Sequence, residues 1–200
     1  MPSVKASIAR HRADWHDAIV RYAELRELAA QQTAVAVADE YGVLVSFRSI
    51  SALDIAMAER WTLGRHGRGW SWCKEVSKAR RRSRCFDAAL ETFGANQRPT
   101  VTALILGRVS KSRVVASLHF LERAPNPNPL AGTVAPIAIR YLEFCAIAFG
   151  CRSTSLQRPV EALVSYYKQL GYTRVVRKKG KIIRLERDLH RDLLSMDAPQ

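Results

Sequence analysis

The stretch from Thr154 to Tyr172 constrains the fold more than any other, because its boundaries and its apolar spacing both predict a helix packed on a sheet. A short strand-like run opens the stretch and stops at Pro159. The helix then runs to about residue 170 and ends at Gly171, which is the order of proline and glycine that helix ends favour. Its apolar residues recur at helical spacing and form one face: Leu163, Val164, Tyr167 and Leu170.

The end of this stretch resembles a signature of the GNAT superfamily of N-acetyltransferases, in which a tyrosine, three residues and a Gly-Phe or Gly-Tyr pair close a helix. Here Tyr167 stands four residues before Gly171, and Tyr172 follows. The resemblance implies that Tyr167 is the general acid that protonates the departing thiolate of coenzyme A, with Tyr166 as its rival. The alternative is an amphipathic helix with a packed tyrosine and a glycine cap.

Composition indicates a basic globular protein. Its 200 residues suffice for one domain with a sizeable core. The net charge of +14 predicts attraction to nucleic acid, an anionic lipid surface or a phosphate-bearing cofactor. The four cysteines and five histidines lack metal-ligand spacing, so neither a metal site nor a disulfide framework is expected. The absence of a signal peptide and of a long apolar run favours a cytoplasmic protein without a membrane span.

The order of the patterns along the chain is similar to that of the GNAT fold. We expect an α/β (α+β) domain over residues 41–187, with a mixed, mostly antiparallel sheet whose central parallel strands splay apart between flanking helices. Residues 188–200 form a polar tail. The expected elements are a strand over 41–49, helices over 51–63 and 71–82, strands over 85–90, 101–106 and 114–121, a helix over 135–149, a strand over 154–156, a helix over 160–170 and a hairpin over 173–187.

Residues 1–40 form an N-terminal extension in this scheme. Apolar residues recur along it at spacings of three, four and seven, which predicts a long amphipathic helix over about 5–32, outside the main sheet. Such a helix could cover a sheet face, make a homodimer contact or lie against another partner.

A proline-rich loop that closes on Gly132 connects the third meander strand to the apolar helix. A strand, a small turn and a helix N-terminus can bind a pyrophosphate, because backbone N–H groups and the helix dipole face the anion. In GNAT proteins this is the coenzyme A site, written Q/R-x-x-G-x-G/A. This chain departs from the motif at Pro129 and Val134. The resemblance assigns to acetyl-CoA the residues Phe120, Leu121, Leu130, Ala131, Gly132, Thr133, Val134 and Ala135.

Two side chains are candidate general bases. An amine attacks a thioester only when neutral, and a free alkylamine has a pKa of roughly 10, so a base or a desolvating site is needed. Glu122 lies where the family often places such a carboxylate, acting directly or through water; a surface carboxylate beside Arg123 is the alternative. His119 is the second candidate, with simple strand packing as its alternative. A backbone N–H near Phe120 would meet the oxyanion.

The most basic segment follows two tryptophans, Trp70 and Trp72. Phosphate contacts and base stacking by such a helix could bind RNA or DNA, or the charge could attract an acidic acceptor; a solvated basic face is the alternative. The preceding glycine-rich basic loop, residues 64–69, could hold phosphates or be an ordinary loop. The candidate anion-binding residues are Lys74, Lys78, Arg80, Arg81, Arg82 and Arg84.

The sequence therefore predicts transfer of an acetyl group from acetyl-CoA to an amine in a ternary complex. The acceptor is a small molecule, a protein or, as for some GNAT toxins, an aminoacyl-tRNA. Val160 and Leu163 depart from the Asn and Ala that many members have in the last helix. A catalytically weak GNAT-fold protein that binds nucleic acid or a protein through its basic surface is the alternative.

Overall fold

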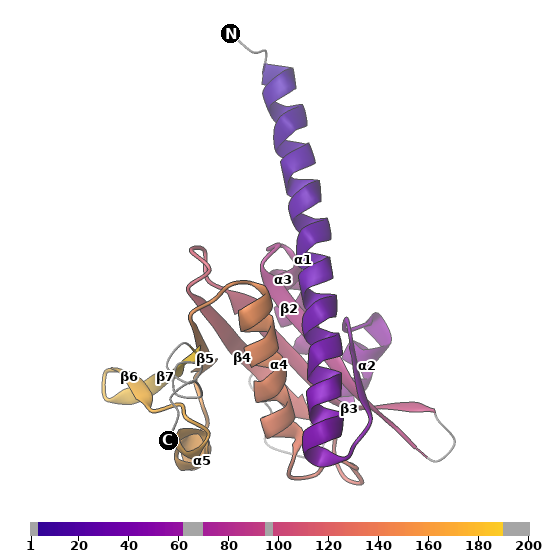
Figure 1. The fold of residues 1–200 in the computed structure, drawn as a ribbon, viewed down its shortest axis with the longest axis vertical. Helices are drawn as coiled ribbons and strands as arrows, with labels where there is room; N and C mark the ends of the chain where they lie inside the picture. Colours follow the sequence, from indigo (N-terminus) through magenta and orange to yellow (C-terminus); the bar gives the residue numbers. More distant parts are fainter. Residues whose placement is uncertain (1–3, 62–69, 95–97, 190–200) are drawn as a thin grey trace, which may run out of the picture.

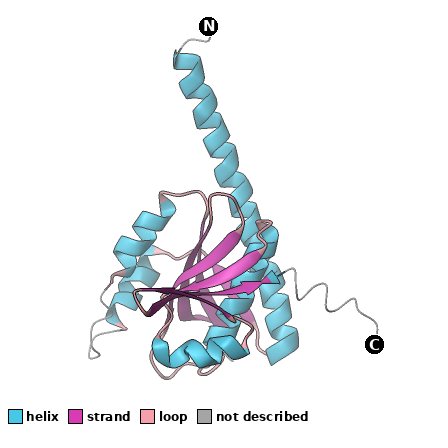
Figure 2. Ribbon diagram, turned by 90° about the vertical axis from the view of Figure 1, so that its left-hand side faces the viewer, coloured by secondary structure: helices cyan, strands magenta, loops and turns pink. Residues whose placement is uncertain are grey.

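The computed structural model describes residues 4–61, 70–94 and 98–189. One seven-stranded sheet has the order β1-β2-β3-β4-β5-β7-β6, and helices lie on both of its faces (Figures 1 and 2). The strands are β1 (Val45–Arg48), β2 (Cys85–Phe93), β3 (Pro99–Val109), β4 (Val115–Arg123), β5 (Ser153–Gln157), β6 (Arg174–Lys178) and β7 (Lys181–Asp188). The helices are α1 (Val4–Tyr41), α2 (Ala52–Arg60), α3 (Trp72–Arg80), α4 (Val134–Ala148) and α5 (Val164–Gln169), with a 3-10 turn, η1 (Glu161–Leu163), before α5.

The first helix, α1, is longer than the sequence predicts. It ends at Gly42, whose φ of +65° is left-handed and whose N–H donates to the carbonyl of Ala38 at 2.9 Å, a common glycine-ended helix terminus. The strand expected to start at Tyr41 therefore starts at Val45. The C-terminal half of α1 lies beside α4, whereas its N-terminal part extends beyond the sheet (Figure 1).

The sheet separates two hydrophobic cores. The larger one lies under α1 and α4, and Tyr22 and Val37 of α1 are part of it. The expected extension thus contributes to the main core, and the division at residue 41 stays a prediction. The smaller core lies under α2 and α3 and consists of Ile50, Ala58, Trp72, Val76, Ala89, Leu104 and Leu106.

The expected parallel pair of strands is confirmed, and it is short. β4 pairs with β5 from Val115–Ser153 to Leu118–Leu156, and β4 then continues to Arg123 without a partner on that side among the described residues. Figure 1 shows β6 and β7 to one side of the first four strands. Against β3, Leu118 and Phe120 of β4 face consecutive residues, so His119 is an extra, bulged residue.

The helix expected over residues 160–170 is present over a shorter range and begins with a 3-10 turn. Val160 is extended, the 3-10 turn η1 follows, and α5 has only six residues. Pro159 disfavours a helical residue before it, and no side chain caps the start of α5. Gly171, with φ +88°, ends α5 as predicted.

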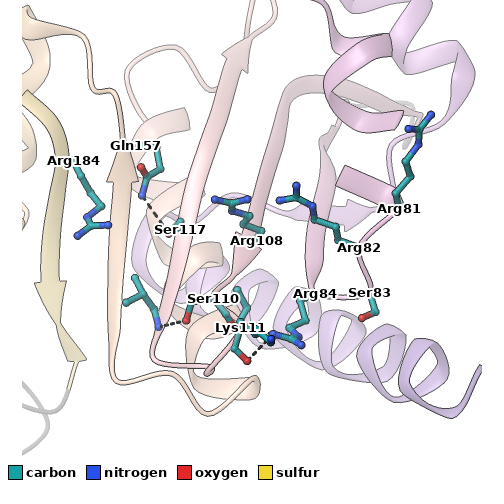
Figure 3. A pocket seen from close by; sticks show the side chains of 12 residues that line it. Arg81, Arg82, Ser83, Arg84, Arg108, Ser110, Lys111, Ser117, Gln157 and Arg184 are labelled. Carbon is teal, nitrogen blue, oxygen red and sulfur yellow. Dashed lines mark hydrogen bonds between the residues drawn. The ribbon is translucent and has the colours of Figure 1, made fainter. Parts of the chain in front are cut away.

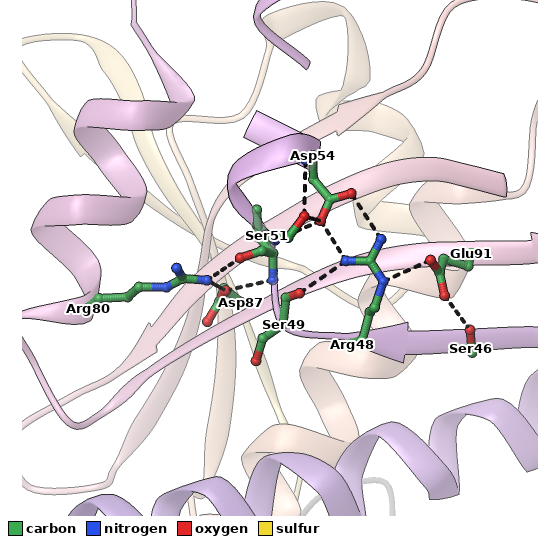
Figure 4. Close-up of polar contacts among 9 residues, drawn as sticks. Ser46, Arg48, Ser49, Ser51, Asp54, Arg80, Asp87 and Glu91 are labelled. Atoms are coloured by element: carbon green, nitrogen blue, oxygen red, sulfur yellow. Dashed lines mark hydrogen bonds and ion pairs between the residues drawn. The ribbon is translucent and has the colours of Figure 1, made fainter. Parts of the chain in front are cut away.

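An arginine network holds α2 and α3 on the sheet (Figure 4). Arg48 of β1 makes a bidentate ion pair with Asp54 of α2 at 2.5 and 2.9 Å and donates to Glu91 of β2 at 2.8 Å. Asp54 also accepts from the backbone N–H of Ser51, which completes a capping box. These bonds tie the start of α2 to two strands.

Arg80, at the end of α3, likewise forms an ion pair with a buried carboxylate of the sheet. It pairs with Asp87 of β2 at 2.7 Å and also donates to the carbonyl of Ile50. The other donor to Asp87 is the buried backbone N–H of Ile50, at 3.0 Å. Because its charge is already paired inside the fold, the assignment of Arg80 as a free anion-binding residue is not supported.

Candidate functional site

The loop after β4 is held by its own hydrogen bonds. The buried side chain of Asn128 donates to the carbonyls of Thr102 and Ala124 and accepts from the N–H of Leu130. The N–H groups of Thr133 and Val134 then donate to the carbonyl of Leu130. Most of the loop N–H groups are therefore already used within the loop.

Gly132 and Ala135 are two exceptions next to the helix start. Their N–H groups make no hydrogen bond to any described residue, and both lie at the start of α4. Gly132 is exposed, has φ +92°, and a Cβ added to it would meet nothing within 4 Å. This helix start therefore offers two free donors and a helix dipole to an anion, while Leu130 is buried in the core.

The two tyrosines of α5 differ from Tyr172 in their hydroxyl groups. Tyr172 is fully buried, and its hydroxyl accepts a hydrogen bond from Thr154 at 3.0 Å. Tyr167 is half-buried against the larger core, and its hydroxyl bonds to no described residue. Burial, and secondarily Tyr166, raises the pKa of Tyr167 above 10, so the phenol keeps its proton at neutral pH. The hydroxyl of Tyr167 is thus protonated at neutral pH and makes no hydrogen bond to a described residue.

Glu122 has a buried neighbour. Its Oε2 accepts a 2.6 Å hydrogen bond from the indole N–H of Trp72, which is fully buried. The ring of Trp70 packs on Trp72 and on Phe120, with centroids 4.9 and 4.6 Å away. Trp72 is therefore a core residue that fixes Glu122, and the expectation that both tryptophans stack on bases is wrong for Trp72.

The buried imidazole of His119 lacks a hydrogen bond that a histidine packed in a strand would be expected to make. Its Nε2 is buried and has no hydrogen-bond partner among the described residues. Burial lowers the pKa of His119 to about 4, and the positive charges of Arg108, Arg158 and Arg82 add to the effect. At neutral pH its imidazole is uncharged. A base with so low a pKa is poorly matched to taking a proton from an ammonium group.

A cavity of 640 Å³ opens on the α3 side of the sheet (Figure 3). Ser117 and Gln157 line it, and both are hydrogen-bonded to the buried Ser155: the two serine hydroxyls lie 2.8 Å apart, and Gln157 donates to Ser155 at 3.1 Å. Figure 3 shows the guanidinium groups of Arg184, Arg108 and Arg82 in a row along the cavity. The basic residues that line the cavity are Arg81, Arg82, Arg84, Arg108, Lys111 and Arg184.

The comparisons rest on structure alone. No protein-family model and no curated sequence matches the chain. Among solved structures, the PaiA N-acetyltransferase of Thermoplasma acidophilum, in complex with coenzyme A, matches with a TM-score of 0.50 at 15% identity, over 72% of this chain and 98% of that one. The spermidine/spermine N-acetyltransferase SpeG of Vibrio cholerae matches with a TM-score of 0.55 at 13% identity, over 76% and 98%.

This chain has the GNAT fold. The expected fold class is thereby confirmed: a mixed, mostly antiparallel sheet with one splayed parallel pair, flanked by helices. An uncharacterized protein from Bacillus halodurans is also similar, with a TM-score of 0.53 at 13% identity, over 73% of this chain and 84% of that one.

On this GNAT fold the residues predicted from sequence fall into separate groups. Phe120, Leu121 and Glu122 occupy the end of β4 that is paired with β3 but not with β5, and residues 130–135 follow it at the start of α4. Of the six basic candidates only Arg81, Arg82 and Arg84 line the cavity. Lys78 instead pairs with Glu75 at 2.7 Å. Lys74 does not line the cavity, and residues 64–69 lie outside the described residues.

Sequence reasoning missed half of the cavity. Arg108 comes from the end of β3, Lys111 from the turn between β3 and β4, and Arg184 from β7. Their only signal is the basic composition of those segments, which is shared by many exposed turns. Among the described residues no cluster of His, Cys, Asp or Glu is placed to hold a metal ion. None of the described helices is both long and apolar enough to cross a bilayer.

Proposed function

We propose that the protein transfers an acetyl group from acetyl-CoA to an amine acceptor. The observation that carries the proposal is the end of the β4–β5 pairing at Leu118–Leu156, while β4 continues to Arg123 in a GNAT fold. The free edge of a strand presents N–H and C=O groups, which can bind an amide-containing arm by adding it to the sheet.

The residues fit acetyl-CoA at two places. The end of β4 that is not paired with β5 would hold the amide-bearing arm, and the N–H groups of Gly132 and Ala135, at the start of α4, would hold phosphate. The fit is weaker in the loop than at the strand, because Leu130, Thr133 and Val134 use their N–H groups or side chains internally. When bound, acetyl-CoA supplies the acetyl group.

Two side chains would then carry out the proton transfers of the reaction, Glu122 as the base and Tyr167 as the acid. Glu122, held by Trp72, would accept a proton from the attacking amine directly or through water. Tyr167 would hold a proton at its hydroxyl for the leaving sulfur, and its raised pKa keeps that proton in place until it is needed. A backbone N–H of Phe120 or Leu121 would stabilise the oxyanion.

Calorimetry with coenzyme A tests the proposal directly. We expect saturable binding, and Gly132→Val should weaken it about tenfold because a β-branched residue resists the left-handed backbone next to the phosphate donors. Gly180→Val is the matched control, since Gly180 has φ +76° and equally open surroundings in the β6–β7 turn. An absence of binding at millimolar coenzyme A would contradict the enzyme and favour the catalytically weak binding protein.

Tyr167→Phe tests the proposed acid. The substitution keeps the ring in the core and removes only the hydroxyl, which bonds to no described residue. General acid catalysis contributes about a hundredfold to ten-thousandfold, so turnover should fall at least about tenfold with coenzyme A affinity unchanged. Tyr166→Phe is the control on the neighbouring ring. Unchanged turnover in Tyr167→Phe would make this tyrosine a packing residue.

A further inference from the structure

The cavity over Ser117 and Gln157 concentrates positive charge without counter-charge. Its lining contains no aspartate or glutamate. Arg81, Arg82 and Arg108 have no ion pair with any described carboxylate, and Arg84 donates to the carbonyl of Lys111 at 2.6 Å, which leaves its charge uncompensated. Guanidinium groups stay protonated at any physiological pH, so this charge is permanent.

Several arginines elsewhere in the described part of the chain are paired with carboxylates. Arg48 binds Asp54 and Glu91, Arg80 binds Asp87, and Arg140 binds Glu40 and Glu143. Arg184, at the rim of the cavity, is paired with the buried Glu186 through its Nε. The cavity, by contrast, gathers four arginines without a paired carboxylate on one concave surface, which is built from the end of α3, β3, the β3–β4 hairpin and β7.

The position of the cavity separates it from the loop after β4. Ser117 lies near the start of β4 and Arg123 at its end, six residues further along, which is about 20 Å in an extended strand. The cavity thus lies toward the opposite end of β4 from the loop that contains Gly132. Gln157, in contrast, comes directly after the last β4–β5 pair and reaches both the cavity and the point where the strands separate.

We propose that the cavity binds the phosphate group of the acceptor, and that the acceptor is a small phosphorylated amine. This inference rests on the proposed acetyl transfer. Planar guanidinium groups recognise phosphate through paired, charge-assisted hydrogen bonds, and the serine hydroxyls and Gln157 amide add neutral polar groups. A volume of 640 Å³ is in the range of small-ligand sites. Phosphate bound here would hold the amine of the same molecule near the separation of β4 and β5.

A matched pair of probes tests the inference by calorimetry at low salt, with coenzyme A present. O-phosphoethanolamine should bind about tenfold more tightly than ethanolamine, because only the former offers phosphate to the arginines. The double variant Arg82→Gln, Arg108→Gln should lose about tenfold in affinity for O-phosphoethanolamine. Both side chains are exposed and unpaired, so the variant should fold. The control is Arg21→Gln, Lys178→Gln, which removes two equally exposed charges from α1 and β6.

Each outcome decides between distinct possibilities. Equal binding of the two amines, or equal losses in the double variant and its control, would overturn the inference in favour of diffuse surface charge. Tighter binding of a short single-stranded RNA than of O-phosphoethanolamine, lost in the double variant, would overturn the small-molecule assignment. Coenzyme A affinity should be the same in parent and double variant. If it falls with Arg82→Gln, Arg108→Gln, the cavity holds the cofactor; if the parent binds no coenzyme A, the proposed acetyl transfer fails independently.

Discussion

Two groups of arginines lie close together on the α3 side of the sheet and have opposite surroundings. Arg48 and Arg80 are paired with buried carboxylates that also accept backbone or cap hydrogen bonds (Figure 4). Arg82 and Arg108 face a cavity and have no ion pair with a described carboxylate (Figure 3). Arg80 and Arg82 lie only two positions apart in sequence, so the local pattern cannot tell which arginine holds the fold together and which one is available to a ligand.

The largest expected effect is on the paired group. Asp87→Ala removes the partner of Arg80 and leaves the buried N–H of Ile50 without an acceptor. Removing one member of such a contact costs about 3 kcal/mol of unfolding free energy. Urea denaturation of the parent and the variant measures it.

The matched control comes from the cavity. Arg82→Gln removes an exposed arginine that pairs with no described carboxylate, so its unfolding free energy should change by about 0.5 kcal/mol or less. A similar loss in both variants would show that the two groups do not differ.

A smaller effect should appear as a pH dependence of the paired group. Burial opposes ionisation of Asp54, but hydrogen bonds from Arg48 and Ser51 outweigh it and lower its pKa to about 2. A carboxyl whose folded pKa lies below its unfolded value stabilises the fold above the unfolded value, and this is lost as the pH falls through the folded pKa. Parent and Asp54→Asn should therefore differ by about 2 kcal/mol at neutral pH.

Urea unfolding at a series of pH values measures this difference. It should stay constant down to about pH 5 and shrink between about pH 4 and 2. A constant difference down to pH 2 would mean that the charge of Asp54 does not contribute and that only its geometry does.

The smallest effect concerns the cavity group and its neighbour His119. The low pKa of His119 comes first from burial and then from Arg108, Arg158 and Arg82, partly offset by Glu75. Arg108→Gln removes one positive charge and leaves the burial, so the pKa of His119 should rise from about 4 but stay below 6.5.

Imidazole resonances followed by NMR through a pH titration measure the shift, with His119→Gln to assign the signal. Arg21→Gln, on α1, is the control and should leave the pKa of His119 where it is. No change in Arg108→Gln would mean that solvent screens the cavity charges, and it would weaken the case for anion binding there.

Local signals predicted the elements well where the cause is local. Ser51 and Ser71 cap α2 and α3 with side-chain hydrogen bonds to the third residue of each helix, and Gly171 ends α5 with a positive φ. The predicted end of the first helix was wrong, and so was the predicted start of the first strand at residue 41. A glycine such as Gly42 followed by apolar residues is compatible both with a strand start and with a helix end. The helix predicted over 160–170 is present over residues 161–169, but its first turn is 3-10, because one apolar face does not show whether a turn is α-helical or 3-10.

The candidate site could be predicted only in part. Tyr167, Glu122 and Gly132 were found through the resemblance to the GNAT signature, and their roles stay predictions. The contact between Trp72 and Glu122 joins residues 50 positions apart, so no local pattern reports it. The cavity could not be predicted, because Arg108, Ser117 and Arg184 line it from different strands. The order of strands in the sheet brings these residues together.

The sequence by itself determined the element order, the caps and the strong positive charge, because these depend on spacing and composition over a few residues. The tertiary structure decided which charges are neutralised. Arg80 meets the carbonyl of Ile50 from 30 positions away, and Arg48 meets Glu91 from 43 positions away. An ion pair depends on the distance between its charges in space, and that distance is set by the pairing of strands and the packing of α3 on the sheet.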